Sequence, residues 1–132
     1  MNRIQVKVEK IESNEQLTLL SLRSKNHKLS MMSLELNPDI TEGKELIVAT
    51  KAANIAIAKD YKGLLSYSNQ LCVEILSMEM GKLLCSLSLR FENTLLESII
   101  TTNSAKRMQL KVGEEVTALI KANDLAMEEL LI

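Results

Sequence analysis

Two copies of one sequence pattern run through the chain, and this duplication restricts its fold more than any single residue does. Residues 2–8 (Asn-Arg-Ile-Gln-Val-Lys-Val) have the same pattern as residues 69–75 (Asn-Gln-Leu-Cys-Val-Glu-Ile). The two segments lie about 67 positions apart, and later in each copy an offset of about 70 relates residues 50–52 to residues 120–122. A recurrence near both ends of each copy indicates two tandem units, and ligand chemistry should be sought in the repeated features.

The length of the chain sets the size of these units. With 132 residues, it suits one ordinary domain or two very small ones. We expect a first repeat at residues 1–60 and a second at residues 64–132, joined by a linker around residues 60–63. A unit of about 65 residues buries only a modest core, so the copies should pack together or the chain should form oligomers.

Alternation of apolar and polar residues predicts β-strands in both copies. It is clearest in residues 4–8, in residues 85–91 and again in residues 116–120. Turns between hairpin strands are predicted at Ser13–Asn14 and at Met80–Gly81, the second supported by its glycine.

One short helical turn is expected in each copy. In the second copy, Asn103 or Ser104 can cap a helix over residues 105–110, and Gly113 ends it before the next strand. In the first copy, Pro38 cuts the corresponding helix short. Five or so short strands and one helical turn per copy predict an all-β protein made of two tandem, small OB-like barrels.

The charge balance argues against several classes of partner. The chain has 16 basic and 17 acidic residues, interspersed along its length, whereas nucleic-acid-binding proteins usually carry a basic face. Two tyrosines and one phenylalanine offer little surface for base stacking. No apolar run approaches the roughly 20 residues of a membrane helix, and the N-terminal residues alternate instead of forming a signal-peptide core. We therefore expect a cytoplasmic protein without nucleic-acid or membrane partners.

Neither the cysteines nor the histidine belongs to a recognisable reactive motif. Cys72 and Cys85 lack the spacing of a CxxC pair, so we expect both to be reduced and buried in strands. His27 lies in a polar stretch and is expected to be a solvated loop residue. Without paired carboxylates, a nucleophile motif or a group of metal ligands, the sequence predicts no enzyme, no catalytic residue, no metal and no cofactor.

A group of hydroxyl and amide donors in the second copy suits a small oxyanion. Thr101 and Ser104 lie at the start of the predicted helix, where backbone N–H groups are free and the partial charge is positive. A lysine such as Lys121 would add a charge-assisted hydrogen bond. Donors without an acidic neighbour would favour a fully deprotonated anion over one that keeps a proton. Taken alone, however, such residues are also typical of a helix cap and of a solvated charge.

The order of motifs in the second copy adds a family resemblance. Residues 101–105 read Thr-x-x-Ser-Ala, and residues 108–122 read Met-x-Leu-x-x-Gly-x-x-Val-x-Ala-x-Ile-Lys-Ala. Together with the opening Ser-Tyr-Ser-Asn-x-Leu of residues 66–71, they resemble the TOBE or Mop domain of molbindins. The resemblance covers about residues 64–128 and reaches the first copy through the internal repeat.

The resemblance implies two tandem Mop barrels that bind molybdate or tungstate between barrels and serve as stores, buffers or sensors of molybdenum. Carried over by position, the oxyanion contacts that it implies are Ser66, Ser68, Thr101, Ser104, Ala105, Lys121 and Ala122, with Lys51 and Ala52 as counterparts in the first copy. Ser68 stands where the family usually has arginine, and Glu35 of the first copy would repel an anion. The second copy is therefore expected to supply the better site.

Other hypotheses stay open beside oxyanion binding. A module of this family that has lost its ligand would act as an oligomerisation or protein-interaction unit, and the missing arginine favours that reading. A nucleic-acid-binding OB barrel is a third hypothesis, which the charge and the few aromatic residues oppose. For assembly, the small repeats and the apolar residues 130–132 predict a homo-oligomer. The resemblance implies a trimer, with a dimer as the alternative.

Overall fold

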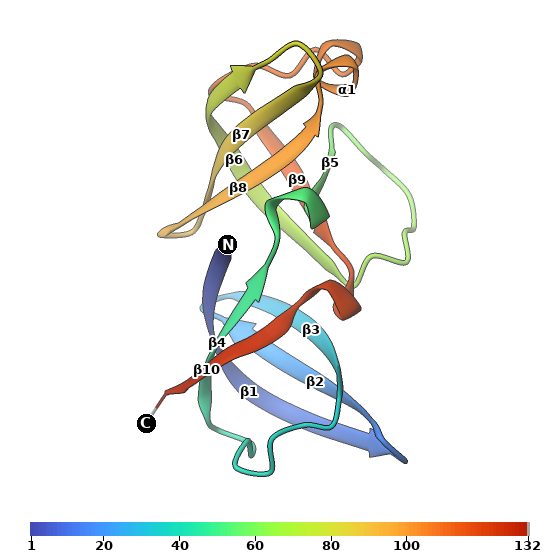
Figure 1. The fold of residues 1–132 in the computed structure, drawn as a ribbon, viewed down its shortest axis with the longest axis vertical. Coiled ribbons are helices and arrows are strands. Elements are labelled where there is room, and N and C mark those ends of the chain that lie inside the picture. The colour runs from blue at the N-terminus through green and yellow to red at the C-terminus, as the bar shows by residue number, and fades with distance from the viewer. Residues whose placement is uncertain (132) are drawn as a thin grey trace.

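The two repeats build two five-stranded antiparallel sheets, stacked along the long axis of the molecule (Figure 1). The computed structural model describes residues 1–131. The strands are β1 (Asn2–Asn14), β2 (Leu17–Ser24), β3 (His27–Leu34), β4 (Glu45–Thr50), β5 (Ala56–Ala58), β6 (Asn69–Met80), β7 (Leu84–Phe91), β8 (Thr94–Thr101), β9 (Glu115–Ile120) and β10 (Ala126–Leu131). Residues 1–131 also form one helix, α1 (Thr102–Arg107), and two 3-10 turns, η1 (Ala52–Asn54) and η2 (Ala122–Asp124). The predicted all-β, OB-like fold is confirmed.

Each sheet takes one edge strand from the other repeat. The strand orders are β10-β4-β1-β2-β3 and β5-β9-β6-β7-β8. β5 ends the first repeat but pairs with β9 in the second sheet, with Ile57 opposite Ala118. β10 ends the second repeat but pairs with β4 in the first sheet, with Met127 opposite Val48. Each barrel therefore contains strands from both halves of the chain.

The repeat extends to the details of the backbone. Equivalent irregularities interrupt β1 after Val8 and β6 after Ile75. Gly43 donates its N–H to the Val8 carbonyl and Gly113 donates to the Ile75 carbonyl, each at 2.8 Å. Both glycines have φ values of at least 90°, in the region that favours glycine.

The apolar residues that alternate along the strands form the core, as the sequence pattern predicts. In β1 and β6 its buried members are Ile4, Val6, Val8, Leu71, Val73 and Ile75.

Local structure departs from the sequence-based expectations at the turns. β1 runs through Asn14, so its hairpin turn lies beyond Ser13–Asn14, and Glu15 carries the positive φ. The turn at Met80–Gly81 forms where expected, because β6 ends at Met80 and the Gly81 N–H bonds the Leu84 carbonyl. Residues 35–44 form turns instead of a helix, as Pro38 predicts. The first repeat has only η1, whose counterpart in the second repeat is η2, and in the second repeat α1 begins at Thr102 and is capped by Thr101, not by Asn103 or Ser104 as expected.

The two cysteines differ in exposure. Cys85 is buried, as expected, and burial raises the pKa of its thiol. The thiol therefore stays protonated and unreactive. The expectation for Cys72 was wrong: it is exposed, because it lies between Leu71 and Val73 on the outward-facing phase of β6.

Two buried asparagines join the barrels where they meet. The side-chain amide of Asn2 donates to the Glu97 carbonyl at 2.8 Å and accepts from the Glu97 N–H at 2.7 Å. Asn69, its counterpart in the second repeat, bonds the Ser30 carbonyl at 3.0 Å and the Ser30 N–H at 2.7 Å. Glu97 and Ser30 belong to β8 and β3, the last strands of their sheets. Each asparagine therefore satisfies backbone groups on an edge strand of the opposite barrel.

His27 also contacts the opposite barrel, so the expectation of a solvated loop residue was wrong. Its Nδ1 lies 3.1 Å from Glu92 Oε2, and its ring meets the Phe91 ring edge-on with 4.8 Å between centroids. The Ser24 hydroxyl donates to the other Glu92 oxygen at 2.9 Å. Glu92 and Lys25 both have positive φ values and occupy equivalent positions in hairpin turns of the two repeats. The turn at Lys25 and the turn at Glu92 therefore meet at this contact.

Thr50 offers a test of packing in the first barrel. Its side chain is buried, and among residues 1–131 its hydroxyl is the one buried side-chain group without a hydrogen-bond partner. The second repeat has Ile120 at the equivalent position. Thr50→Val is expected to raise the free energy of unfolding by about 1 kcal/mol, because no unpaired hydroxyl is then buried. Urea unfolding measures the change, and a midpoint lower than that of the unaltered protein would contradict it.

Candidate oxyanion-binding site

The hydroxyl pair that the sequence predicts is assembled at the start of α1. β8 ends at Thr101, whose Oγ1 accepts from the Ser104 N–H at 3.1 Å and donates to Ser104 Oγ at 2.9 Å. Thr101 is exposed and Ser104 is half-buried. Because Thr101 uses its proton within the pair, the Ser104 hydroxyl proton is available to a ligand. The first turn of α1, which lies wholly within the described residues, contains no acidic residue.

Contacts with the β6–β7 turn hold the backbone of this pair. The Thr102 hydroxyl donates to the Gly81 carbonyl at 2.9 Å, and the Thr102 N–H donates to the Leu83 carbonyl at 2.9 Å. Ala105, which the resemblance places in the site, is 1% exposed, and its side chain packs into the core. The first turn of α1 is therefore fixed to the barrel on the side away from its exposed hydroxyls.

Lys121, the lysine predicted to bind the oxyanion, lies at the junction of the two barrels and not within α1. Lys121 is exposed and directly precedes η2, in which Ala122 is the first residue. It lines a hollow together with Tyr67, Asp124 and residues 53–56 of η1 and β5. The hollow also includes the end of β8, up to the residue before Thr101.

The remaining predicted contacts lie near the same junction. Ser66 and Ser68 are exposed in the segment between β5 and β6, on either side of Tyr67, which lines the hollow. Lys51 directly precedes η1, and Ala52 is the first residue of η1. η1 packs against β8 of the second barrel. The η2 turn packs in the same way against β3 of the first barrel.

In one chain the predicted residues therefore form two groups. The hydroxyl group is at α1, which lies at the end of the second barrel remote from the first (Figure 1). Lys121 is at the barrel junction, where it lines the hollow with Tyr67, the residue between Ser66 and Ser68.

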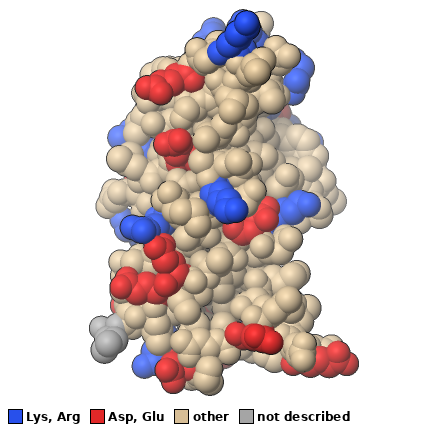
Figure 2. Space-filling view, in the orientation of Figure 1, with Lys and Arg blue, Asp and Glu red and all other residues tan. Residues whose placement is uncertain are grey.

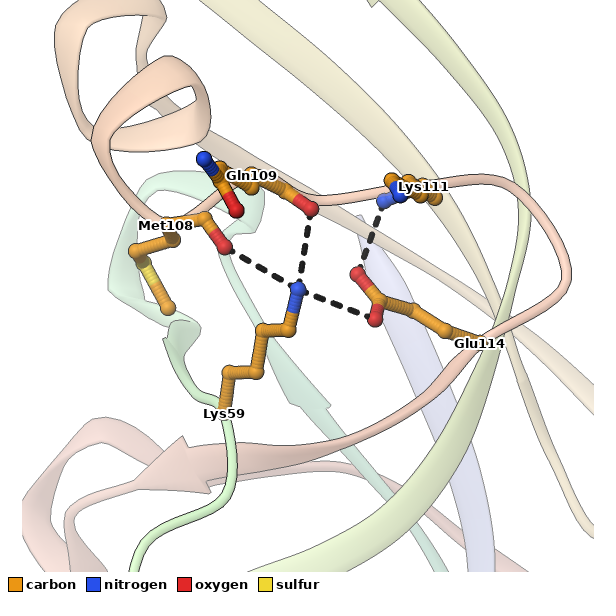
Figure 3. Close-up of polar contacts among 5 residues, drawn as sticks. All are labelled: Lys59, Met108, Gln109, Lys111 and Glu114. Carbon is orange, nitrogen blue, oxygen red and sulfur yellow. Dashed lines mark hydrogen bonds and ion pairs between the residues drawn. The ribbon is translucent and has the colours of Figure 1, made fainter.

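A lysine that the sequence did not single out holds the other end of α1. Lys59 directly follows β5, and its Nζ donates to the Met108 carbonyl at 3.1 Å and to the Gln109 carbonyl at 2.9 Å (Figure 3). The same Nζ lies 3.1 Å from Glu114 Oε2, and Glu114 Oε1 accepts from the Lys111 N–H at 2.7 Å. The ammonium thus meets three acceptors, which matches its three donors. We call this arrangement the Lys59 cluster.

The Lys59 cluster changes the acidity of its carboxylate. Burial raises the pKa of Glu114, but the bonds from the Lys111 N–H and the Lys59 ammonium outweigh it, and the pKa lies below its ordinary value of 4.5. A carboxyl group whose pKa is lowered by folding stabilises the fold above its unfolded-state pKa. That stabilisation is lost as the pH falls through the folded-state pKa.

Glu114→Gln is therefore expected to lower the free energy of unfolding at neutral pH. Its difference from the unaltered protein should shrink as the pH falls below about 4.5, because the carboxylate of the unaltered protein then becomes protonated. Urea unfolding of both proteins at a series of pH values measures this difference. A difference that stays constant across that range would contradict the assignment.

Fold and site together define a class, the tandem OB-like barrel proteins with exchanged strands. Residues 65–127 match the model of the TOBE domain, and this range includes Thr101, Ser104 and Lys121. The second repeat therefore matches the TOBE domain, as its motifs indicate.

Among solved structures, the fold is similar to that of the cytoplasmic molybdate-binding protein ModG in a form with molybdate bound. The TM-score is 0.89 and the sequence identity is 20%, and the match covers 97% of this chain and 95% of the ModG chain. The similarity therefore extends over both barrels. No curated protein matches the chain in sequence. Within residues 1–131, no helix is long and apolar enough to cross a membrane.

Proposed function

We propose that the protein binds molybdate or tungstate in the cytoplasm, without catalysis, as a store, buffer or sensor of these oxyanions. The observation that carries the proposal is the TOBE match, because it spans the residues that offer hydroxyl and ammonium donors. The similarity of the whole fold to a molybdate-binding protein supports the same ligand class. The proposal requires no cofactor.

The donors suit a doubly charged tetrahedral anion. In its pair with Thr101, Ser104 Oγ accepts a hydrogen bond, so its own proton is not used there. An ammonium such as that of Lys121 would add a charge-assisted hydrogen bond to the anion. Hydrogen phosphate keeps a proton that needs an acceptor, and the first turn of α1 has no acidic residue among its described side chains to provide one. Molybdate and tungstate carry no such proton at neutral pH.

We place the complete site between chains, since one chain separates its two groups of donors. Exposed apolar side chains support self-association, and they lie at both repeats: Leu19, Met32 and Leu34 in the first, and Leu83, Leu84 and Leu95 in the second. A homo-oligomer with closed symmetry would cover them, and we favour a trimer over a dimer. Light scattering at micromolar concentration tests this assembly, and a monomer would refute both.

The full set of proposed contacts is testable by titration. It comprises Ser66, Ser68, Thr101, Ser104, Ala105, Lys121 and Ala122, with Lys51 and Ala52 from the first repeat. Calorimetric titration with molybdate, tungstate, sulfate and phosphate should give binding heat with the first two anions. No heat with molybdate or tungstate at millimolar concentration would overturn the proposal.

A second candidate is a TOBE module that has lost its ligand and serves as an oligomerisation or protein-interaction unit. Two observations favour it: Ser68 stands in place of an arginine, and Asp124 lines the same hollow as Lys121. A negative titration together with a stable oligomer would support this candidate.

Surface charge gives little support to a nucleic-acid partner. On the face shown in Figure 2, lysines and arginines alternate with acidic residues instead of forming one basic surface. The net charge of −1 agrees with this distribution. Labelled single strands should not be retarded by the protein at low salt.

A further inference from the structure

We propose that Lys59 is a positioning residue for the oxyanion donors at the start of α1. The inference rests on the proposed function, since it concerns the same hydroxyl pair. It adds a residue of the first repeat, outside residues 65–127, to the binding machinery of the second. Lys59 does not contact the hydroxyl pair itself and would act through the backbone of α1.

The first step is the weakness of α1 as an isolated element. It has six residues, and a helix of that length is not stable in water without tertiary contacts. At its first turn, Thr102 bonds the β6–β7 turn. At its last turn, Lys59 supplies the side-chain contact that binds two carbonyl groups, those of Met108 and Gln109. A cation at this end of a helix also interacts favourably with the partial negative charge there.

The second step is a continuous path of hydrogen bonds from Lys59 to the donors. Lys59 Nζ binds the Met108 carbonyl, and the Met108 N–H donates to the Ser104 carbonyl at 2.9 Å. The Ser104 N–H in turn donates to Thr101 Oγ1 at 3.1 Å. Both the N–H and the carbonyl group of Ser104 are thus hydrogen-bonded. Losing Lys59 would release the last turn of α1 and, through it, the orientation of the Ser104 hydroxyl.

The third step is the contrast with the first barrel. In the second repeat, no lysine corresponds to Lys59: the offset of 70 gives Glu129, which is exposed on β10, and the strand pairing gives Leu130. The corresponding region of the first barrel, residues 35–44, forms turns without a helix. Lysine and helix are thus found together in the second barrel, the one whose hydroxyl pair is proposed to bind the anion.

The test compares Lys59→Met with Lys111→Met in the full chain. Each variant removes one positive charge close to Glu114, but Lys111→Met keeps the backbone N–H that bonds Glu114 Oε1. We expect Lys59→Met to weaken molybdate binding by about tenfold and Lys111→Met by less than about threefold, because only the first variant removes bonds to α1. Lys59→Arg, which keeps a cationic donor, should restore most of the affinity.

Amide hydrogen exchange separates positioning from a general loss of stability. In Lys59→Met, exchange at the N–H groups of Ser104 and Met108 should accelerate by about tenfold, while exchange in β1 and β2 stays unchanged. Equal loss of affinity in the two variants, or unchanged exchange in α1, would overturn the inference alone. Failure of the unaltered protein to bind molybdate or tungstate would instead overturn the proposed function, and the inference with it.

Discussion

The double variant Ser104→Ala with Lys121→Met is expected to bind molybdate about 100-fold more weakly than the unaltered protein. A hydrogen bond to a charged partner contributes about 1.5–3 kcal/mol, and about 1.4 kcal/mol corresponds to a tenfold change in affinity. Each single substitution should therefore cost about tenfold or more. Calorimetric titration measures all three variants under one buffer condition.

These substitutions spare the contacts that hold the fold. Thr101 Oγ1 still accepts the Ser104 N–H in Ser104→Ala, so the cap of α1 persists. Lys121 is exposed, and its replacement opens no cavity. A matched control, Ser77→Ala with Lys10→Met, removes one hydroxyl and one ammonium from exposed positions outside the proposed site. Equal weakening by the control would show that general charge, rather than this site, determines affinity.

Asn69→Leu is expected to lower the free energy of unfolding by about 3 kcal/mol. Asn69 is 0% exposed, and leucine would leave both the N–H and the carbonyl of Ser30, which is half-buried, without their partner. Each such loss costs about 1–3 kcal/mol. Urea unfolding should show a lower midpoint, provided that the slope of the transition is unchanged.

A control variant and a comparison between the two asparagines test this prediction further. Gln70→Leu changes the neighbouring exposed side chain and should alter stability by less than about 0.5 kcal/mol. Asn2→Leu should cost less than Asn69→Leu, because Asn2 is 6% exposed and lies near the N-terminus, where water can reach the released groups. An Asn69→Leu protein as stable as Gln70→Leu would show that the two barrels do not depend on the asparagine contact.

Local patterns in the sequence were sufficient to predict the strands and the hydroxyl pair at the start of α1, but not the residue that caps this helix. Period-two alternation identified the buried face of β1 and β9, because one face of each strand lies in the core. The Thr101–Ser104 pair followed from the Thr-x-x-Ser spacing, although Asn103 or Ser104 was expected to cap the helix and Thr101 caps it instead. Both features depend on neighbours in the chain.

Features that depend on distant partners were not predictable in the same way. Either β5 or β10 has the apolar character to pair with β4, so alternation does not reveal which barrel receives which strand. The bond between Lys59 and Met108 spans 49 positions and exists only because β5 is exchanged. His27 likewise acquires its partner, Glu92, from a turn 65 positions away.

Because the two halves of the chain exchange strands, each half depends on the other for folding. The surface residues of each half can nevertheless differ from those of the other. A polypeptide with only one repeat could reach this architecture only by associating with a second copy, each completing the other, and both halves would then be identical. Covalent fusion removes that constraint. One half can keep a hydroxyl-bearing helix while the other carries Pro38 and Glu35 in its place, so a shared scaffold allows the surfaces of the two halves to differ.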